Sequence, residues 1–211
     1  MLGEQVRAAS GGPGRPRSRA AQQAILDATL ELLAESGFEG MSVEAVAERA
    51  GVGKATIYRR WKSKQELVAA ALATIDAQVT VPDTGSTRGD LQALIRTFYR
   101  VTTSGTVLGP SIGRVLVAAA HNPELLRLLR ETVMAKRKAM GSQILRRGVE
   151  RGEVRPDVNL DLVIELLVGL ILQRVVINSA EVSTLLPLIE DTLDILWRGI
   201  ATRPEVPARE T

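Results

Sequence analysis

The chain has 211 residues, of which 45% are hydrophobic, 24% are charged and only 3% are aromatic. This is the composition of a folded protein, and because its apolar residues are mostly Ala, Leu, Val and Ile, it favours packed helices over sheets. Cysteine is absent and His121 is the one histidine, which excludes disulfides, thiolate nucleophiles, iron–sulfur clusters and the common zinc sites, so no metal or other cofactor is predicted.

The N-terminal region is predicted to be a flexible basic arm over residues 1–17, because glycine and proline recur between Gly11 and Pro16. Apolar residues at helical spacing then predict a first helix from about Ser18 to Ser36. Gly37 follows as its left-handed stop.

Three shorter helices are predicted next. Ser42 is a natural N-cap for a helix over 43–50, and Gly51 ends that helix. Another short helix follows over 54–60. The sequence from Ser63 to Glu66 has the form of a capping box and predicts a fourth helix that runs to about residue 78.

The net charge of the chain is concentrated in this region. Residues 1–64 hold ten Lys and Arg against seven Asp and Glu, whereas residues 65–211 hold seventeen of each. The segment 51–64 carries five basic residues and no acidic one. Two short helices around a glycine turn, behind a longer helix, form a helix-turn-helix arrangement, and its coincidence with the basic segment indicates a nucleic-acid partner. A merely solvated basic surface is the alternative.

The rest of the chain is predicted to be a larger helical body, with a tail over 204–211. Asn122-Pro123-Glu124 is a strong helix start. The predicted fold class is therefore all-α, with a three-helix head, a larger body and about nine helices in all. No stretch resembles a membrane span, and the cytoplasm is the expected location. The body helices are predicted at about 88–103, 111–120, 123–151, 160–177 and 183–202.

The stretch from Ala20 to Leu67, above all AGVGKATIYRRWKSKQEL from Ala50, resembles the N-terminal domain of the TetR family of transcriptional regulators. The resemblance implies a helix-turn-helix DNA-binding domain over 18–65 and a ligand-binding and dimerisation domain over 66–203. It also implies a homodimer that binds double-stranded operator DNA with a palindromic sequence. Gly53 departs from the family, which usually has Ser as the cap of the recognition helix.

The recognition helix is expected to enter the major groove with its N-terminal end. Lys54 and Arg59 can donate to guanine, while small residues at Gly53 and Ala55 permit close approach to the bases. Phosphate contacts fix the register without reading sequence. The residues expected to contact phosphates are Ser42, Thr56, Tyr58, Arg60 and Lys64.

Each of these residues also has a structural alternative. Ser42 can serve only as a helix cap, and Trp61 is interpreted as a core residue of the head. Arg15 and Arg17 belong to an arm of the kind that enters the minor groove, although Gly/Pro/Arg tails are common in proteins without that role.

The body is expected to hold a mainly hydrophobic effector in an apolar pocket. The helices over 160–177 and 183–202 carry more hydrophobic surface than one monomer core covers, which indicates a four-helix dimer interface or a wall of that pocket. Polar residues on otherwise apolar helices are the candidate ligand contacts, each of which can equally face solvent or the interface. These candidates are Tyr99, Arg114, His121, Glu165, Gln173 and Arg174.

The sequence thus predicts a DNA-binding transcriptional regulator and not an enzyme, most simply a repressor that a small hydrophobic ligand releases from its operator. Two other interpretations stay open. One is a helical small-molecule carrier with an incidental basic head, and the other is an enzyme that uses His121. The effector, the operator and the regulated genes are not predicted.

Overall fold

The computed structural model describes residues 15–103 and 112–202, and within these ranges the protein is helical, as predicted. The only bridge between extended residues in the described part joins Val154 and Ala201. No helix in these ranges is long and apolar enough to cross a membrane. The helices are α1 (Arg15–Gly40), α2 (Val43–Arg49), α3 (Lys54–Tyr58), α4 (Lys64–Ala73), α5 (Thr87–Thr103), α6 (Ile112–Ala120), α7 (Pro123–Leu129), α8 (Ala135–Glu150), α9 (Leu160–Leu172) and α10 (Leu186–Ile200).

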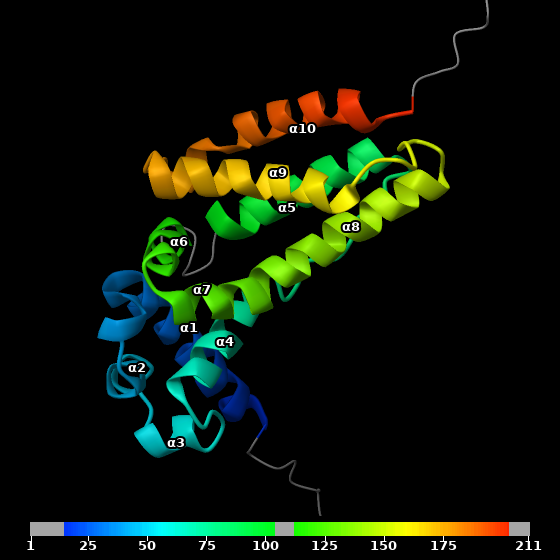
Figure 1. Ribbon diagram of the computed structural model, residues 1–211. Helices are drawn as coiled ribbons and strands as arrows, with labels where there is room; N and C mark the ends of the chain where they lie inside the picture. The colour runs from blue at the N-terminus through cyan, green and yellow to red at the C-terminus, as the bar shows by residue number, and fades with distance from the viewer. Residues whose placement is uncertain (1–14, 104–111, 203–211) are drawn as a thin grey trace, which may run out of the picture.

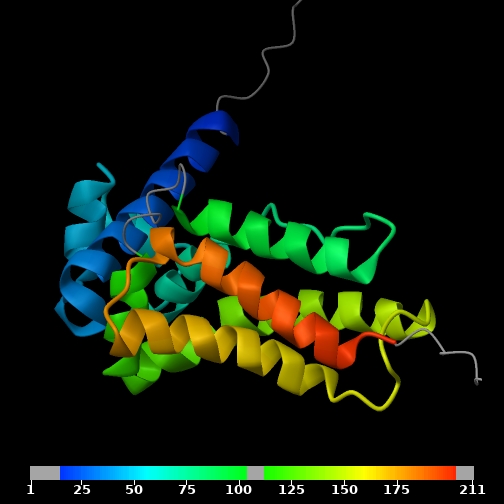
Figure 2. The same ribbon diagram turned by 90° about the horizontal axis from the view of Figure 1, so that it is seen from above.

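The helices are arranged in a small head and an elongated body (Figure 1). The head consists of α1 to α4, and α2 and α3 lie at the end of the molecule opposite α9 and α10. Seen from above, α5, α8, α9 and α10 run alongside one another (Figure 2). The protein therefore consists of an N-terminal helix-turn-helix region and a C-terminal helical bundle.

Two hydrophobic cores hold these parts together. The first core joins α1 to α4 with α6 and α7, and it includes Ile25, Leu33, Leu67 and Leu125, none of which is accessible to solvent. The second core lies within the bundle and centres on Ile144, Leu145 and Leu193. The first core contains residues of both the head and the body. The head is therefore packed against α6 and α7 and does not move independently of them.

Several helix boundaries differ from the sequence prediction. α1 begins at Arg15, three residues early, so Arg15 and Arg17 stand in its first turn and not in an arm that ends at residue 17. At the other end, Gly37 has φ 71° and ψ −179°, which interrupts the helix as predicted, but one more helical turn follows to Gly40. α4 ends at Ala73 and gives way to a series of turns.

The predicted long helix over 123–151 is present as a continuous segment. Asn122 caps it, because its Oδ1 accepts the Leu125 N–H at 2.8 Å, and Pro123 follows in the first turn. A π-helical turn over Arg130–Met134 joins α7 to α8. When α7 and α8 are counted as one, the described residues hold nine helices.

Candidate functional site

The helix-turn-helix is held by one sharp turn and a buried contact between its two helices. Gly51, with φ 64°, supplies the left-handed turn after α2. The Ser42 hydroxyl caps α2 by accepting the Ala45 N–H at 3.1 Å. Val46 of α2 and Ile57 of α3 are buried in the head core and fix α3 against α2. The remaining surface of α3 is thereby directed outward.

The exposed face of α3 contains every residue that the sequence predicts to touch bases. Gly53, Lys54, Ala55 and Arg59 are all exposed, as is Tyr58, whereas Thr56 is half-buried. An added Cβ at Gly53 would meet nothing within 4 Å, so the start of α3 is open to a large partner. This geometry, a short helix that presents its N-terminal end and basic side chains, matches what major-groove reading requires.

Lys54 is not free on this face. Its ammonium pairs with the Glu44 carboxylate of α2 and lies 5.6 Å from the centre of the Tyr58 ring. The hydrogen bond from Lys54 lowers the pKa of Glu44, and the same bond raises the pKa of Lys54. An acidic side chain therefore stands beside the predicted base-reading lysine, where a nucleic acid would compete with it.

The two arginines after α3 differ in their surroundings. The Arg59 guanidinium has no hydrogen-bond or ion-pair partner among the described residues. Arg60 instead turns toward α1, donating to the Ser18 hydroxyl at 2.5 Å and to the Gln22 side chain at 2.6 Å. The structure therefore shows Arg60 fastening the start of α1 to the end of α3, a contact that the sequence prediction missed.

Lys64 and Ser63 lie at the start of α4. The Ser63 hydroxyl accepts the Glu66 N–H at 3.1 Å and Glu66 accepts the Lys62 N–H at 2.8 Å, a pairing close to the predicted capping box. The Lys64 ammonium lies 4.6 Å from the centre of the Phe38 ring. Trp61 is half-buried against the head core.

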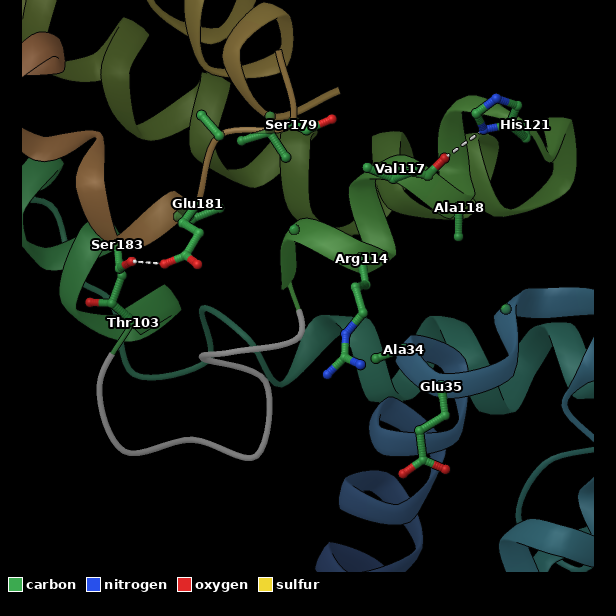
Figure 3. A pocket seen from close by; sticks show the side chains of 15 residues that line it. Ala34, Glu35, Thr103, Arg114, Val117, Ala118, His121, Ser179, Glu181 and Ser183 are labelled. Atoms are coloured by element: carbon green, nitrogen blue, oxygen red, sulfur yellow. Dashed lines mark hydrogen bonds between the residues drawn. The ribbon is translucent and has the colours of Figure 1, made fainter. Parts of the chain in front are cut away.

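The body contains a wide cavity of about 770 Å³ between α1, α6 and the segment over 179–183 (Figure 3). Arg114 and His121, both predicted as ligand contacts, line it. Arg114 extends from α6 toward Glu35 of α1, and the ring Nδ1 of His121 bonds to the Val117 carbonyl at 2.9 Å (Figure 3).

A second cavity, of about 150 Å³, lies inside the bundle and is lined almost entirely by apolar side chains, mainly of α5, α6, α9 and α10 and of the segment 129–134. Tyr99 lines it and donates its hydroxyl hydrogen to the Ser183 carbonyl. Arg137 of α8 also lines it and was not predicted, because on the sequence it is one of several basic residues in a charged stretch.

The other three candidate ligand contacts line neither cavity. Glu165 is exposed and pairs with Lys138 at 3.2 Å, and the exposed Gln173 donates to Asn178 at 3.2 Å. Arg174 is half-buried. For these three residues the role of ligand contact stays a prediction that neither of the two cavities supports.

α9, the π-helical turn that follows it and α10 expose large apolar residues. Ile177 is 74% exposed and Ile195 is 70% exposed, and the other members are Leu162, Leu166 and Leu172. Several large exposed apolar residues on helices that pack against each other are more typical of an interface than of a solvated face. No cluster of three or more His, Cys, Asp or Glu side chains that could hold a metal occurs in residues 15–103 and 112–202.

Two family models match the chain. Residues 25–71 match the model described as "Bacterial regulatory proteins, tetR family", and residues 81–187 match "Tetracyclin repressor-like, C-terminal domain". The first match contains α2, α3 and most of α4, and the second contains α5 to α9 and most of the residues that line the two cavities.

Known proteins resemble the chain over most of its length. The HTH-type transcriptional regulator YdeS of Bacillus subtilis is 35% identical, over 81% of this chain and 85% of the relative. A DNA-binding transcriptional repressor named TetR, of Mycobacteroides abscessus, is 36% identical over 52% of this chain and 57% of the relative. The crystal structure of the TetR-family regulator SCO0332 superposes with a TM-score of 0.62 at 29% identity, covering 87% of this chain and 99% of that one.

Proposed function

Because the chain belongs to the TetR family of bacterial transcriptional regulators, we propose that it represses transcription by binding a palindromic operator as a homodimer and leaves the operator when a small apolar effector binds. The observation that carries this proposal is the exposed basic face of α3. The buried side chain of Ile57 anchors α3 in the head core, and no other atom crowds Gly53 at the start of the helix. The site of action is the cytoplasm, where operator DNA lies.

In the proposed complex, the side chains of α3 divide into two groups. Lys54 and Arg59 donate to base edges, with Gly53 and Ala55 allowing the helix to approach. Contacts to phosphates set the register. The proposed phosphate contacts are Ser42, Thr56, Tyr58, Arg60 and Lys64. Arg60 has to give up its hydrogen bond to Ser18 to make its contact. Arg15 and Arg17, at the start of α1, are proposed to enter the minor groove.

The dimer is proposed to form through the apolar side of α9 and α10. Dimerisation buries Leu162, Leu166 and Ile195 and places two heads at a fixed spacing, which a palindrome with two half-sites requires. The head would then span residues 18–65 and the ligand-binding and dimerisation domain residues 66–203.

The effector is proposed to bind in the body, where two cavities exist, and to change the spacing of the heads. The resemblance to a named repressor supports repression as the direction of control. The alternative of a carrier with an incidental basic head is not favoured. The matched family consists of regulators, and α3 exposes the basic residues that contact with the DNA major groove requires. The same family membership speaks against an enzyme.

The proposal is tested by selecting DNA from a random duplex pool with the purified protein. Enrichment of one palindromic sequence is expected, and the variant Lys54→Ala/Arg59→Ala should enrich none while keeping the melting temperature of the wild type. If the wild type retained all duplexes equally, the head would bind DNA without sequence preference, and the proposal of a specific operator would be refuted.

A further inference from the structure

The inner cavity of the body is apolar except at one end. Its aliphatic and aromatic walls come mainly from α5, α6, α9 and α10 and from the segment 129–134 that leads into α8, while α8 itself contributes Gly141 and Arg137. Two hydroxyls reach it, but both already donate to backbone carbonyls: Tyr99 to Ser183, and Thr102 to Phe98 at 2.8 Å. Arg137 is the one charged side chain among the described residues that line the cavity.

The Arg137 guanidinium is fixed in position by two neighbours. Its Nε and Nη2 donate to the Asp76 carboxylate at 2.6 and 2.9 Å, and its Cζ lies 4.5 Å from the centre of the Phe98 ring. Its Nη1 has no protein partner in the described part of the chain. A planar guanidinium with one unused nitrogen beside an apolar cavity is a site for an oxygen acceptor, and a carboxylate satisfies it best.

Asp76 connects this site to the head. It is 2% exposed and lies in the turns that directly follow α4, the helix that begins after the recognition helix. Its carboxylate has Arg137 as its only ion-pair partner among the described residues, and its backbone carbonyl accepts the Lys136 ammonium. A buried carboxylate that loses its counter-charge is strongly unfavourable, so this segment depends on Arg137 staying in place.

The cavity is also too small for a bulky ligand without movement. At about 150 Å³ it offers roughly the room in which a benzene-sized molecule binds. Protein interiors do not compress, so a longer molecule has to part the helices that wall the cavity. One of these helices is α8, which carries Arg137 away from Asp76 when it moves.

We infer that the effector is a small apolar molecule bearing one carboxylate, that Arg137 binds this carboxylate in the inner cavity, and that the resulting loss of the Arg137–Asp76 ion pair transmits binding through α4 to the head. The inference rests on the proposed function for its effect on DNA, but ligand binding can be measured without DNA.

The first experiment is calorimetry of the full-length protein with three probes of equal chain length, octanoate, 1-octanol and octylamine. Octanoate should bind at least tenfold more tightly than the other two. Arg137→Gln should abolish this preference, whereas Arg146→Gln, an exposed arginine of the same helix, should preserve it. Equal binding of octanoate and octanol by the wild type, or a preference that survives Arg137→Gln, would overturn the inference.

Arg137→Gln leaves Asp76 buried without its partner and can unfold the protein, so a second pair of variants is needed. Asp76→Asn frees the guanidinium and should bind octanoate severalfold more tightly than the wild type. Asp76→Asn/Arg137→Gln leaves no unpaired buried charge at this site and should bind octanoate no better than octanol. If the double variant bound octanoate more tightly than Asp76→Asn, a carboxylate site at Arg137 would be contradicted.

The coupling is tested on operator-bound protein. Octanoate should weaken DNA binding of the wild type at least tenfold, and Asp76→Asn should bind octanoate yet lose most of this response. Octanoate bound through Arg137 with unchanged operator affinity would refute the relay through Asp76. A wild type that selects no operator would refute the proposed function instead, and the calorimetric results would still decide the ligand site.

Discussion

Lys54, at the first position of the recognition helix, is paired with Glu44 of the preceding helix. Both side chains are at least half exposed, so the pair adds little to stability and acts mainly on whatever approaches this face. The Glu44 carboxylate is ionised at neutral pH in any case, and the hydrogen bond from Lys54 lowers its pKa further. The protein thus places one negative charge against the lysine that is proposed to read DNA.

Replacing this acid should strengthen DNA binding. Glu44→Gln removes a charge that repels phosphates and frees Lys54, and we expect operator affinity to rise about two- to fivefold at low salt, with a smaller gain at high salt. Fluorescence anisotropy titrations at two salt concentrations measure this. Glu150→Gln, which makes the same charge change at the end of α8, is the control, and an equal gain in both variants would point to net charge alone.

The phosphate contacts should be visible in the salt dependence. If Lys64 neutralises one phosphate, Lys64→Gln lowers the slope of log affinity against log salt by about 0.9 for each head. Lys138→Gln removes the same charge from a lysine of α8 that pairs with Asp161 and Glu165 of α9, outside the helix-turn-helix, and should leave the slope unchanged. Indistinguishable slopes for the wild type and Lys64→Gln would remove Lys64 from the interface.

The head was largely predictable from sequence because its signals are local. The Ser42 cap, the Gly51 turn and the start of α4 each depend on residues within four positions of one another. The same holds for Asn122 at the start of α7. What the local pattern could not give is the contact of Arg60 with Ser18 and Gln22, which joins residues about forty positions apart.

In the body, the sequence predicted the positions of the helices but not which residues line its cavities. Polar residues on apolar helices predict pocket contacts, yet the exposed Glu165 and Gln173 line neither of the two cavities. Arg137 carried no signal, because its partner Asp76 is 61 positions away and only the packing of α8 on the turns after α4 brings them together. Helical periodicity identifies a buried face but not which neighbour covers it.

The apolar side of α9 should be required for dimerisation. Leu166→Glu puts a charge into the proposed interface and is expected to yield monomers in sedimentation velocity experiments. Leu126→Glu is a matched control, because Leu126 of α7 is 48% exposed and Leu166 is 49% exposed. Dimers of Leu166→Glu as stable as those of the wild type would place the interface elsewhere.

Gly148 of α8 should tolerate no side chain. An added Cβ would lie 2.5 Å from the Thr87 Oγ1 and 2.9 Å from a Val154 methyl carbon, so Gly148→Ala is expected to destabilise the protein by about 1–3 kcal/mol despite the better helix propensity of alanine. Denaturant unfolding measures the change. Gly113→Ala in α6, where the nearest atoms are 3.7 Å away, should be neutral or stabilising, and equal losses in both would argue against the close approach.

The buried Asp90 should make stability depend on acid pH. Burial raises the pKa of Asp90, but hydrogen bonds from Thr84 and Arg147 outweigh it, and the pKa is lowered below its usual 3.8. A lowered pKa stabilises the fold above the unfolded value, and this stabilisation is lost as the pH falls through the folded value. The wild type should therefore lose stability below about pH 4.

Asp90→Asn should be less stable than the wild type at neutral pH by about 3–5 kcal/mol, because among the described residues it leaves Arg147 with Asp83, at 3.5 Å, as its one acidic partner, beside its hydrogen bond to the Pro82 carbonyl. It should also lose less stability on acidification. Asp157→Asn, on an exposed residue, should change neither property. Parallel pH profiles for the wild type and Asp90→Asn, measured by thermal unfolding, would contradict this role.

The central claim is that α3 reads DNA sequence, and the most direct test compares two duplexes in fluorescence anisotropy. One carries the palindrome obtained by selection and the other a scrambled sequence of equal composition. The wild type should prefer the palindrome at least a hundredfold at physiological salt, with one dimer bound per site, and Lys54→Ala/Arg59→Ala should bind both duplexes equally and weakly. A preference that persists in the double variant would show that the sequence is read by another part of the molecule.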